Sequence, residues 1–302
     1  MKKRVLITGA AGFAGRHLVP LMSGQGFDVV GTSHDPVRAN VDGFCQLLPA
    51  DLLNFDEVMS VVREVRPTHV VHLAAISFVA HEDVREIYDV NIVGTRNLLR
   101  ALVEMPEKPD GVLLTSSANV YGNSDREVLA ETDVVNPAND YAVSKLGMEL
   151  MSRQFVHRMN VMIARPFNYT GRGQAGNFLV PKIVDHFKSR QRVIELGNVD
   201  VSRDFSDVRS VVAYLARLLE LPQASGQVYN ICSGRPVSLQ SIIDICERIS
   251  GHKIEVIINP KFQRANDVKM LVGNPHKLHA VAGVIDTFTM EDTLRWMLDS
   301  EA

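Results

Sequence analysis

The sequence lacks the features that would mark a disulfide-bonded or metal-binding protein. Its 302 residues include only three cysteines, Cys45, Cys232 and Cys246, which are odd in number, scattered and without a CxxC pair. Such a set is typical of buried thiols in a reducing compartment, so we expect a cytoplasmic protein. We expect no metal site.

Two further absences concern partners. The formal net charge is −3, without the basic excess of nucleic-acid binders, so we expect no nucleic-acid partner. No uninterrupted apolar run approaches the ~20 residues that span a bilayer, so we expect no membrane partner. The N-terminal MKKR could open a secretion signal, but glycines break the run VLITGAAGFAG that follows.

The first half of the chain alternates short apolar runs with longer amphipathic ones. The expected strands are RVLITG, FDVVGTS, THVVHLAA, GVLLTSS and NVMIARP, and the helical patterns between them include FDEVMSVVREVRP, NIVGTRNLLRALVEM and YAVSKLGMELMSRQFVHRM. Alternation of this kind predicts right-handed βαβ units and strands covered on both faces. The predicted fold class is therefore α/β, a Rossmann-like doubly wound parallel sheet.

The pattern loosens after Arg165, where a long loop rich in Gly, Asn and Pro begins. We assign residues 1–165 to a nucleotide-binding Rossmann domain, to which 208–232 return through the strand-like VYNIC. Residues 166–207 and 233–302 are assigned to a smaller, discontinuous C-terminal substrate domain.

A glycine-rich loop follows the first expected strand. Gly9, Gly12 and Gly15 form GxxGxxG, with Phe13 and Ala14 between the last two glycines. Glycines allow a tight turn and let the backbone approach a pyrophosphate at the positive end of a helix. A structural turn is the alternative, but the position between strand and helix favours dinucleotide binding.

The end of the second expected strand bears on which dinucleotide is bound. NAD-preferring enzymes usually place an acid there for the ribose 2′-hydroxyl, whereas this chain has Ser33, with Asp35 one or two residues late. Ser33, His34 or Arg38 could then contact a 2′-phosphate, which favours NADP(H) over NAD(H). Asp51 and Leu52 are expected near the adenine, although Asp51 could instead cap a helix.

The pattern Tyr141-x-x-x-Lys145 lies inside a helical stretch. Residues four apart share a helix face, so the Lys145 ammonium can lie beside the phenol and favour its ionised form. Such a pair is common by chance, but the glycine loop and the hydroxyl of Ser117 upstream make chance improbable. We predict Ser117, Tyr141 and Lys145 as catalytic residues, with Ser117 hydrogen-bonded to the substrate oxygen that Tyr141 protonates.

Five motifs occur together in order: GxxGxxG, His72-Leu73-Ala74-Ala75, Asn91-Ile-Val-Gly-Thr95, SSxxVYG and YxxxK. In this combination the chain resembles, over essentially its whole length, the extended short-chain dehydrogenase/reductases that act on nucleotide-sugars. The resemblance implies an NAD(P)-dependent oxidoreductase with Leu73, Ala74 and Ala75 along the cofactor and Tyr141 and Lys145 contacting it. It also implies a homodimer through the helices carrying YxxxK and NIVGT. Asn91 is expected to support the active-site helix or to cap a helix.

Ala118 and Asn119 narrow the reaction. Dehydratases of this family carry acid–base residues between the triad hydroxyl and the VYG tyrosine, typically a Glu two residues before it. Neither Ala118 nor Asn119 can take up a proton, which disfavours 4,6-dehydration, and decarboxylases resemble the dehydratases in this respect. Asn119 is instead predicted to contact substrate.

The second half is similar to the GDP-mannose branch of the family, particularly in FLVPKIV, ELGNVDVSRDFSDVRSVV and NPKFQRANDVKMLVGNPHKL. The residues predicted to bind the nucleotide-sugar are Ser117, Asn119, Asn168, Lys182, Arg203, Arg264 and Asp267. Asn168 could instead be a turn residue, and either arginine a surface ion-pair residue.

The resemblance and the Ala118–Asn119 pair together favour reduction of a 4-keto group. The expected reaction converts GDP-4-keto-6-deoxy-D-mannose to GDP-D-rhamnose, or to GDP-6-deoxy-D-talose if hydride reaches the opposite face. A nucleotide-sugar 4-epimerase with tightly bound NAD is the first alternative. A non-catalytic nucleotide-sensing binding protein is the second.

Overall fold

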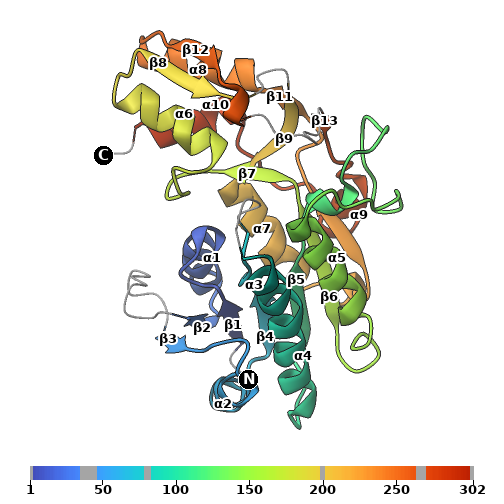
Figure 1. Cartoon of the computed structure of the whole chain (residues 1–302). Coiled ribbons are helices and arrows are strands. Elements are labelled where there is room, and N and C mark those ends of the chain that lie inside the picture. The colour runs from blue at the N-terminus through green and yellow to red at the C-terminus, as the bar shows by residue number, and fades with distance from the viewer. Residues whose placement is uncertain (1–2, 35–45, 78–82, 198–200, 263–269, 300–302) are drawn as a thin grey trace.

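The computed structural model describes residues 3–34, 46–77, 83–197, 201–262 and 270–299. Its centre is a seven-stranded parallel sheet with the order β10-β6-β5-β4-β1-β2-β3 (Figure 1). The strands are β1 (Arg4–Thr8), β2 (Asp28–Ser33), β3 (Gln46–Pro49), β4 (His69–His72), β5 (Gly111–Thr115), β6 (Val161–Pro166) and β10 (Val228–Ile231). The order reverses beside β1, which is where doubly wound sheets bind their ligands.

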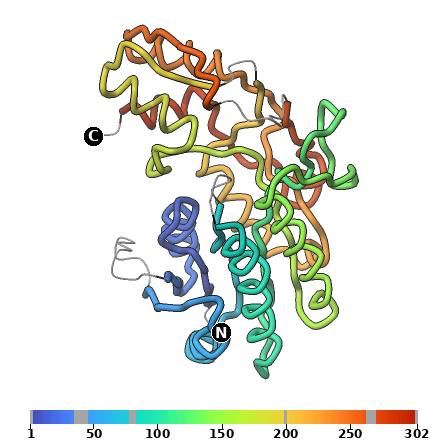
Figure 2. Tube along the Cα trace, viewed as in Figure 1, coloured from blue at the N-terminus to red at the C-terminus, as the bar shows by residue number. Residues whose placement is uncertain are grey.

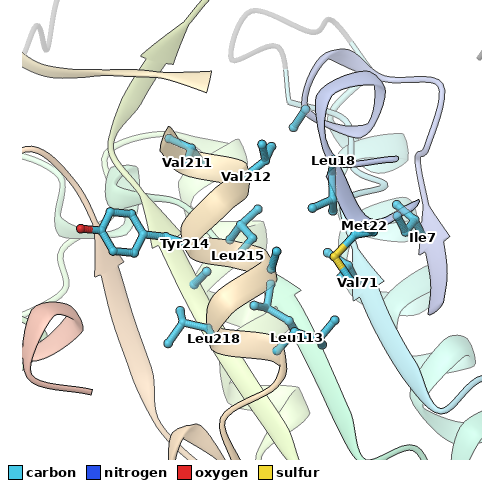
Figure 3. Close-up of a cluster of buried hydrophobic side chains, with 14 of the residues drawn as sticks. Ile7, Leu18, Met22, Val71, Leu113, Val211, Val212, Tyr214, Leu215 and Leu218 are labelled. Carbon is cyan, nitrogen blue, oxygen red and sulfur yellow. The ribbon is translucent and has the colours of Figure 1, made fainter. Parts of the chain in front are cut away.

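Helices cover both faces of this sheet, as its apolar strands require. On one face lie α1 (Phe13–Gly24) and α7 (Val208–Leu219), which pack against each other and the strands (Figure 3). Leu18 and Met22 of α1 approach the sheet near Ile7 and Val71, and Leu215 of α7 lies in the same cluster. The other face is covered by α2 (Phe55–Val65), α4 (Thr95–Glu104) and α5 (Asp140–Ser152).

A second lobe lies at the end of the molecule away from the N-terminus, and the chain ends in it (Figure 2). Its core is formed by α6 (Leu179–Lys188), α8 (Leu239–Ser250) and α10 (Met290–Leu298) with the parallel pair β8 (Val193–Leu196) and β12 (Glu255–Ile258). A small sheet joins the lobe to the rest, with β9 (Ser202–Asp207) paired to β7 (Asn168–Thr170), β11 (Pro236–Ser238) and β13 (Met270–Leu271). Shorter elements are α3 (Val84–Tyr88), the π-helix η1 (Asp89–Gly94), the 3₁₀ turns η2 (Ala118–Tyr121), η3 (Pro222–Ala224) and η4 (Pro260–Phe262), and α9 (His276–Ala282).

Polar residues just before several helices determine where these helices begin. The side chain of Asn54 accepts hydrogen bonds from the backbone at the start of α2, and Asn139 does the same for α5. Asp207 caps α7, and Thr289 forms a capping box with Asp292 at α10. Each cap satisfies backbone N–H groups that the first helical turn leaves unpaired.

The predicted fold class is confirmed, while two expected helices differ in detail. The helix expected over 141–159 ends at Ser152, whose hydroxyl donates to the carbonyl of Glu149, and the chain continues in i→i+3 turns. Such side-chain bonds compete with the regular helical pattern. The helix expected from Asn91 opens as the π-helix η1. Strand β10 pairs with β6 at the sheet edge, while the division into two domains stays a prediction.

Within the described residues, no helix combines the length and apolar character needed to cross a membrane.

Gly122 closes the turn that follows η2 and leads away from the predicted catalytic serine. Its φ of +58° lies in the region that side chains disfavour, and a Cβ there would stand 1.8 Å from the carbonyl oxygen of Asn136. The neighbouring backbone is fixed by a bond of 2.9 Å from Asn136 N to Val120 O, so it cannot simply withdraw.

We therefore expect Gly122→Ala to lower the free energy of unfolding by about 2 kcal/mol or more, measured by urea denaturation. Gly24→Ala is the matched control, because Gly24 lies in α1 with open space around its Cβ position. That variant should gain about 0.5–1 kcal/mol. Equal stability of the two variants would contradict this account of the turn.

Candidate active site

The three predicted catalytic residues come together where β5 ends against α5. Tyr141 and Lys145 lie one turn apart on α5, and both are buried. Ser117 lies two residues after the end of β5, caps η2 and accepts a hydrogen bond from Asn119 N at 3.2 Å. The Ser117 side chain lies close enough to the Tyr141 phenol to act on its pKa. The geometry thus places a hydroxyl, a phenol and an ammonium in one buried site.

The electrostatics of this site differ from the expectation that Lys145 lowers the pKa of Tyr141. Burial raises the pKa of Tyr141, and the hydrogen bond with Ser117 opposes that rise only in part. Lys145 Nζ donates to the carbonyl oxygen of Thr115 at 2.8 Å. Burial lowers the pKa of Lys145 to about 8, while the Glu149 carboxylate acts in the opposite direction. At neutral pH the phenol is therefore protonated and able to donate a proton.

The glycine loop has the shape that a dinucleotide phosphate requires. Gly9 has a φ of +69°, and a Cβ there would lie 2.8 Å from Ala74 N, while a Cβ on Gly15 would lie 2.4 Å from Ala10 O. Helix α1 begins after Gly12 without any side chain capping it. Its first N–H groups, in the turn that contains Phe13 and Ala14, are therefore available to an anion. The backbone fits the predicted cofactor.

The other predicted cofactor residues lie at the same edge of the sheet. Ser33 ends β2, and Leu73, Ala74 and Ala75 follow β4, with Leu73 N bonded to Thr8 O at 3.1 Å. The carboxyl ends of parallel strands form the ligand edge of such sheets.

Asp51 and Leu52 follow β3, also at this edge. The alternative of Asp51 as a helix cap is wrong, because Asn54 caps α2. The Asp51 carboxylate instead accepts from Leu53 N at 2.9 Å, within the turn before that helix.

The hydroxyl of Thr115 is a feature that sequence reasoning missed. It is buried at the carboxyl end of β5 and has no hydrogen-bond partner among the residues that the structure describes. Buried hydroxyls are normally paired, so an orphan at the ligand edge fits a polar group supplied by a bound molecule. In the sequence, the signal for Thr115 is the string TSS before Ala118, which places three hydroxyl side chains in a row at the end of an apolar strand.

A hydrogen-bond chain through His72 holds the ligand edge together. Ala74 N donates to Thr8 Oγ1 at 3.3 Å, and Thr8 Oγ1 lies 2.7 Å from His72 Nδ1. His72 Nε2 lies 2.8 Å from Thr95 Oγ1, whose proton goes to the carbonyl of Asn91. Since Thr95 must accept, His72 carries its proton on Nε2 and accepts from Thr8 on Nδ1. Burial and the nearby Lys145 lower the pKa of His72 to about 3.

Asn91 extends this chain to the active-site helix. Its side chain accepts from Ile76 N at 2.9 Å and donates to Ile76 O at 3.2 Å and to Ser144 Oγ at 2.9 Å. Asn91 therefore fastens the segment after β4 to α5, between Tyr141 and Lys145. It lies within η1 and not at a helix N-cap, which supports the first of the two expectations.

The predicted substrate residues are spread over the junction and the second lobe. Asn168 begins β7 and is exposed, and Arg203 lies on the neighbouring strand β9. Lys182, on α6, donates to Glu195 O at 2.8 Å. The structure thus places Asn119 next to Ser117 of the triad, whereas Asn168, Arg203 and Lys182 lie on β7, β9 and α6. Arg264, Asp267, Asp35, Arg38 and Cys45 lie outside the described residues.

Comparison with known proteins places this site in a family. The family model described as GDP-mannose 4,6 dehydratase matches residues 6–297. The chain belongs to the GDP-mannose 4,6-dehydratase family. As predicted, it is an extended short-chain dehydrogenase/reductase.

Two curated relatives in this family are similar over nearly their whole length. A GDP-6-deoxy-D-talose 4-dehydrogenase from Aggregatibacter actinomycetemcomitans is 35% identical over 287 residues, which cover 95% of this chain and 93% of the relative. A GDP-6-deoxy-D-mannose reductase from Pseudomonas aeruginosa is 32% identical over 317 residues, covering 99% and 97%. The prediction of an NAD(P)-dependent oxidoreductase is thereby confirmed.

Solved structures agree on the fold. A crystal structure from Burkholderia cenocepacia J2315, provisionally described as an epimerase, is 45% identical with a TM-score of 0.93 and covers 98% of this chain and 97% of its own. RMD from Pseudomonas aeruginosa, complexed with NADPH, is 31% identical with a TM-score of 0.84 and covers 99% and 97%. MoeE5 in complex with UDP-glucose and NAD is 26% identical with a TM-score of 0.88 and covers 98% and 97%. Two of these three structures hold a nicotinamide cofactor.

The buried His72 predicts a specific loss of stability in acid. Its pKa is about 3 when folded and 6.5 as an unperturbed group, so as pH falls below 6.5 the unfolded chain binds a proton that the folded chain refuses. The free energy of unfolding should therefore fall by about 1.4 kcal/mol for each pH unit between 6.5 and 4, in addition to the contributions of other groups.

Urea denaturation at several pH values measures this slope. His72→Gln should show a shallower slope by about one proton, with His157→Gln at an exposed position as the control. Identical slopes for His72→Gln and the unsubstituted chain would refute a neutral buried His72.

Proposed function

We propose that this enzyme reduces the 4-keto group of a nucleotide-activated 6-deoxyhexulose with NAD(P)H. The proposed substrate is GDP-4-keto-6-deoxy-D-mannose and the proposed product is GDP-D-rhamnose. The observation that carries the proposal is the turn η2, which follows Ser117 near the buried Tyr141 and places Ala118 and Asn119 where elimination would need a base. Two relatives named for GDP-6-deoxyhexoses support the substrate class.

The two residues that follow Ser117 have no group for proton abstraction from the sugar. Ala118 is 1% exposed and contributes to the apolar cluster at the junction, and the Asn119 amide can form hydrogen bonds without taking up a proton. A 4,6-dehydration would leave the C5 proton without a base from this turn. A substrate that is already a 4-keto sugar needs none. The family name therefore does not determine the reaction of this member.

Each triad residue has a role in the reduction. A bound nicotinamide cofactor supplies hydride to C4 of the sugar. Tyr141 donates its phenolic proton to the C4 oxygen, so that the carbonyl becomes an alcohol and the phenolate regains a proton from solvent. Ser117 donates a hydrogen bond to the same oxygen as negative charge develops there. The Lys145 ammonium would hold the cofactor ribose and would stabilise the phenolate after proton transfer.

NADPH is the preferred cofactor in this proposal. Ser33 ends β2, where a carboxylate would repel the 2′-phosphate, and this position carries no negative charge. RMD, solved with NADPH, supports the same preference. We also propose a cytoplasmic location, because Cys232 and Cys246 are buried free thiols.

Purified protein with NADPH and GDP-4-keto-6-deoxy-D-mannose should consume the NADPH absorbance band and form GDP-D-rhamnose, identified by NMR of the C4 proton. NADH should be used less efficiently. Tyr141→Phe should lower kcat by about 10²–10⁴-fold while NADPH still binds. No consumption of either cofactor would refute the reductase. GDP-6-deoxy-D-talose would correct the product, and retained NAD with interconversion of two unoxidised sugars would indicate an epimerase.

We propose that the enzyme is a homodimer formed through α3, η1 and α5. Four large apolar side chains are exposed on these contacting elements: Val84 at 43%, Val93 at 43%, Val143 at 40% and Leu150 at 49%. Val143 and Leu150 are seven residues apart and share one face of α5. An apolar face of this kind is typical of an interface between subunits.

Leu150→Glu should convert the dimer to a monomer in sedimentation experiments at micromolar concentration, because a carboxylate cannot be buried there unpaired. Val284→Glu is the matched control, since Val284 is 76% exposed outside these helices. A monomeric unsubstituted chain would refute the interface, as would dissociation by Val284→Glu alone.

A further inference from the structure

A fully buried ion pair lies behind the predicted triad. Arg165 Nη2 and Glu149 Oε2 are 2.7 Å apart, and Arg165 Nε donates to Glu149 Oε1 at 2.9 Å. The two side chains are only 6% and 3% exposed. Arg165 lies on β6, and Glu149 lies on α5, one turn after Lys145. Neither residue was singled out from the sequence for a role in the active site.

The pair contacts the backbone segment that carries the triad hydroxyl. Ser116 Oγ donates to Glu149 Oε1 at 2.5 Å, and Ser116 N donates to Ala164 O at 2.7 Å. On one side of Ser116 lies the carbonyl of Thr115, which accepts from Lys145. On the other side lies Ser117. The Glu149 carboxylate therefore contacts Ser116, which lies between Thr115 and Ser117. Thr115 accepts the hydrogen bond from Lys145, and Ser117 carries the predicted catalytic hydroxyl.

The network continues beyond the pair into the junction with the second lobe. Arg165 Nη1 donates to the Tyr121 hydroxyl at 2.9 Å, and Tyr121 donates to Asn230 Oδ1 at 2.7 Å. Asn230 donates in turn to Leu129 O at 3.0 Å. Every member of this chain is satisfied, which makes it rigid. Buried ion pairs are often no more stabilising than apolar residues of similar size, so stability alone gives no reason for this one.

Glu149 is also the charge that acts on Lys145. The groups that act on the ammonium are the Thr115 carbonyl on β5, neutral His72 on β4 and the Glu149 carboxylate on the same helix. Tyr141 lies one turn away on α5, and Arg165 on β6 pairs with Glu149. Burial lowers the pKa of Lys145 to about 8, and the Glu149 carboxylate opposes that fall. Without this carboxylate, Lys145 would lose its proton at a lower pH.

We propose that Glu149, held by Arg165, is a positioning residue of the active site. Its carboxylate orients the Thr115–Ser117 segment through Ser116 and keeps Lys145 in the ammonium form. The expected effect on catalysis rests on the proposed reductase function. The expected effect on cofactor binding rests only on contact between Lys145 and the cofactor ribose.

The pH profile of Glu149→Gln tests the proposal. As pH rises through the Lys145 pKa the ammonium is lost, so both kcat and NADPH affinity fall on the alkaline side. In Glu149→Gln this fall on the alkaline side of the pH profile, the alkaline limb, should begin roughly one pH unit lower. Within the limb kcat should be reduced about tenfold, and at pH 6 the reduction of kcat should be smaller. A purely structural role would lower the active fraction equally at every pH.

Two further variants keep the test decisive. Glu149→Gln leaves Arg165 unpaired and can fail to fold, so Glu149→Gln with Arg165→Met removes both charges and should fold. The alkaline limb of this double variant should still lie below that of the unsubstituted chain. Asp204→Asn is the matched control, because Asp204 is also a buried carboxylate, bonded to Ser233 and Gly234. It should lower stability without moving the limb.

The outcomes separate this proposal from the proposed function. An unmoved limb in both Glu149 variants, or an equal shift in Asp204→Asn, would overturn the positioning role. If the chain reduced no keto sugar, the proposed function would fail, while the pH dependence of NADPH affinity would still decide the role of Glu149. If NADPH affinity is lost at a lower pH in the Glu149 variants but not in Asp204→Asn, the positioning role of Glu149 is supported.

Discussion

The burial of Lys145 is the constraint around which the active site is built. An ammonium group removed from water must be compensated, and here the compensation comes from the Thr115 carbonyl and the Glu149 carboxylate. Glu149 in turn requires Arg165, and His72 stays neutral beside the same positive charge. The need to compensate the buried Lys145 charge thus connects groups on four elements: α5, β4, β5 and β6. Their positions follow from the parallel sheet, because its strands end together at one edge.

Two separate hydrogen-bond networks stabilise the carboxyl edge of the parallel sheet. The chain through His72 and Asn91 fastens the glycine-loop side, from Thr8 to the segment after β4, against α5. The ion-pair network connects Ser116 through Glu149, Arg165 and Tyr121 to Asn230 of β10. Both systems include a residue of α5, so this helix fixes the predicted cofactor side and the predicted sugar side relative to each other. Catalytic groups held on a packed helix keep their geometry better than groups on loops.

The sequence was informative wherever backbone geometry demands a particular residue. Glycine spacing, strand–helix alternation and the Tyr141–Lys145 spacing each follow from local rules, and they predicted the fold class and the grouping of Ser117 with Tyr141. Side-chain hydrogen bonds between distant segments follow no such rule. Nothing in the order of residues pairs Glu149 with Arg165, and a histidine in an apolar strand gives no sign of its two threonine partners. The early end of α5, where the Ser152 hydroxyl donates to the Glu149 carbonyl, likewise has no signal in the spacing of the apolar residues.

The same distinction separates the class of reaction from its stereochemistry. Acid–base capacity is a property of residue type, so Ala118 and Asn119 bear directly on whether elimination is possible. The configuration of the product at C4 depends on which face of the sugar is turned towards hydride, and the triad residues alone do not set that orientation. Relatives named for a 6-deoxy-talose and for a 6-deoxy-mannose resemble this chain to a similar degree, at 35% and 32% identity. Because the predicted triad transfers a proton to the C4 oxygen whichever face receives hydride, we expect the residues that distinguish the two products to act on the sugar and not on the transferred proton.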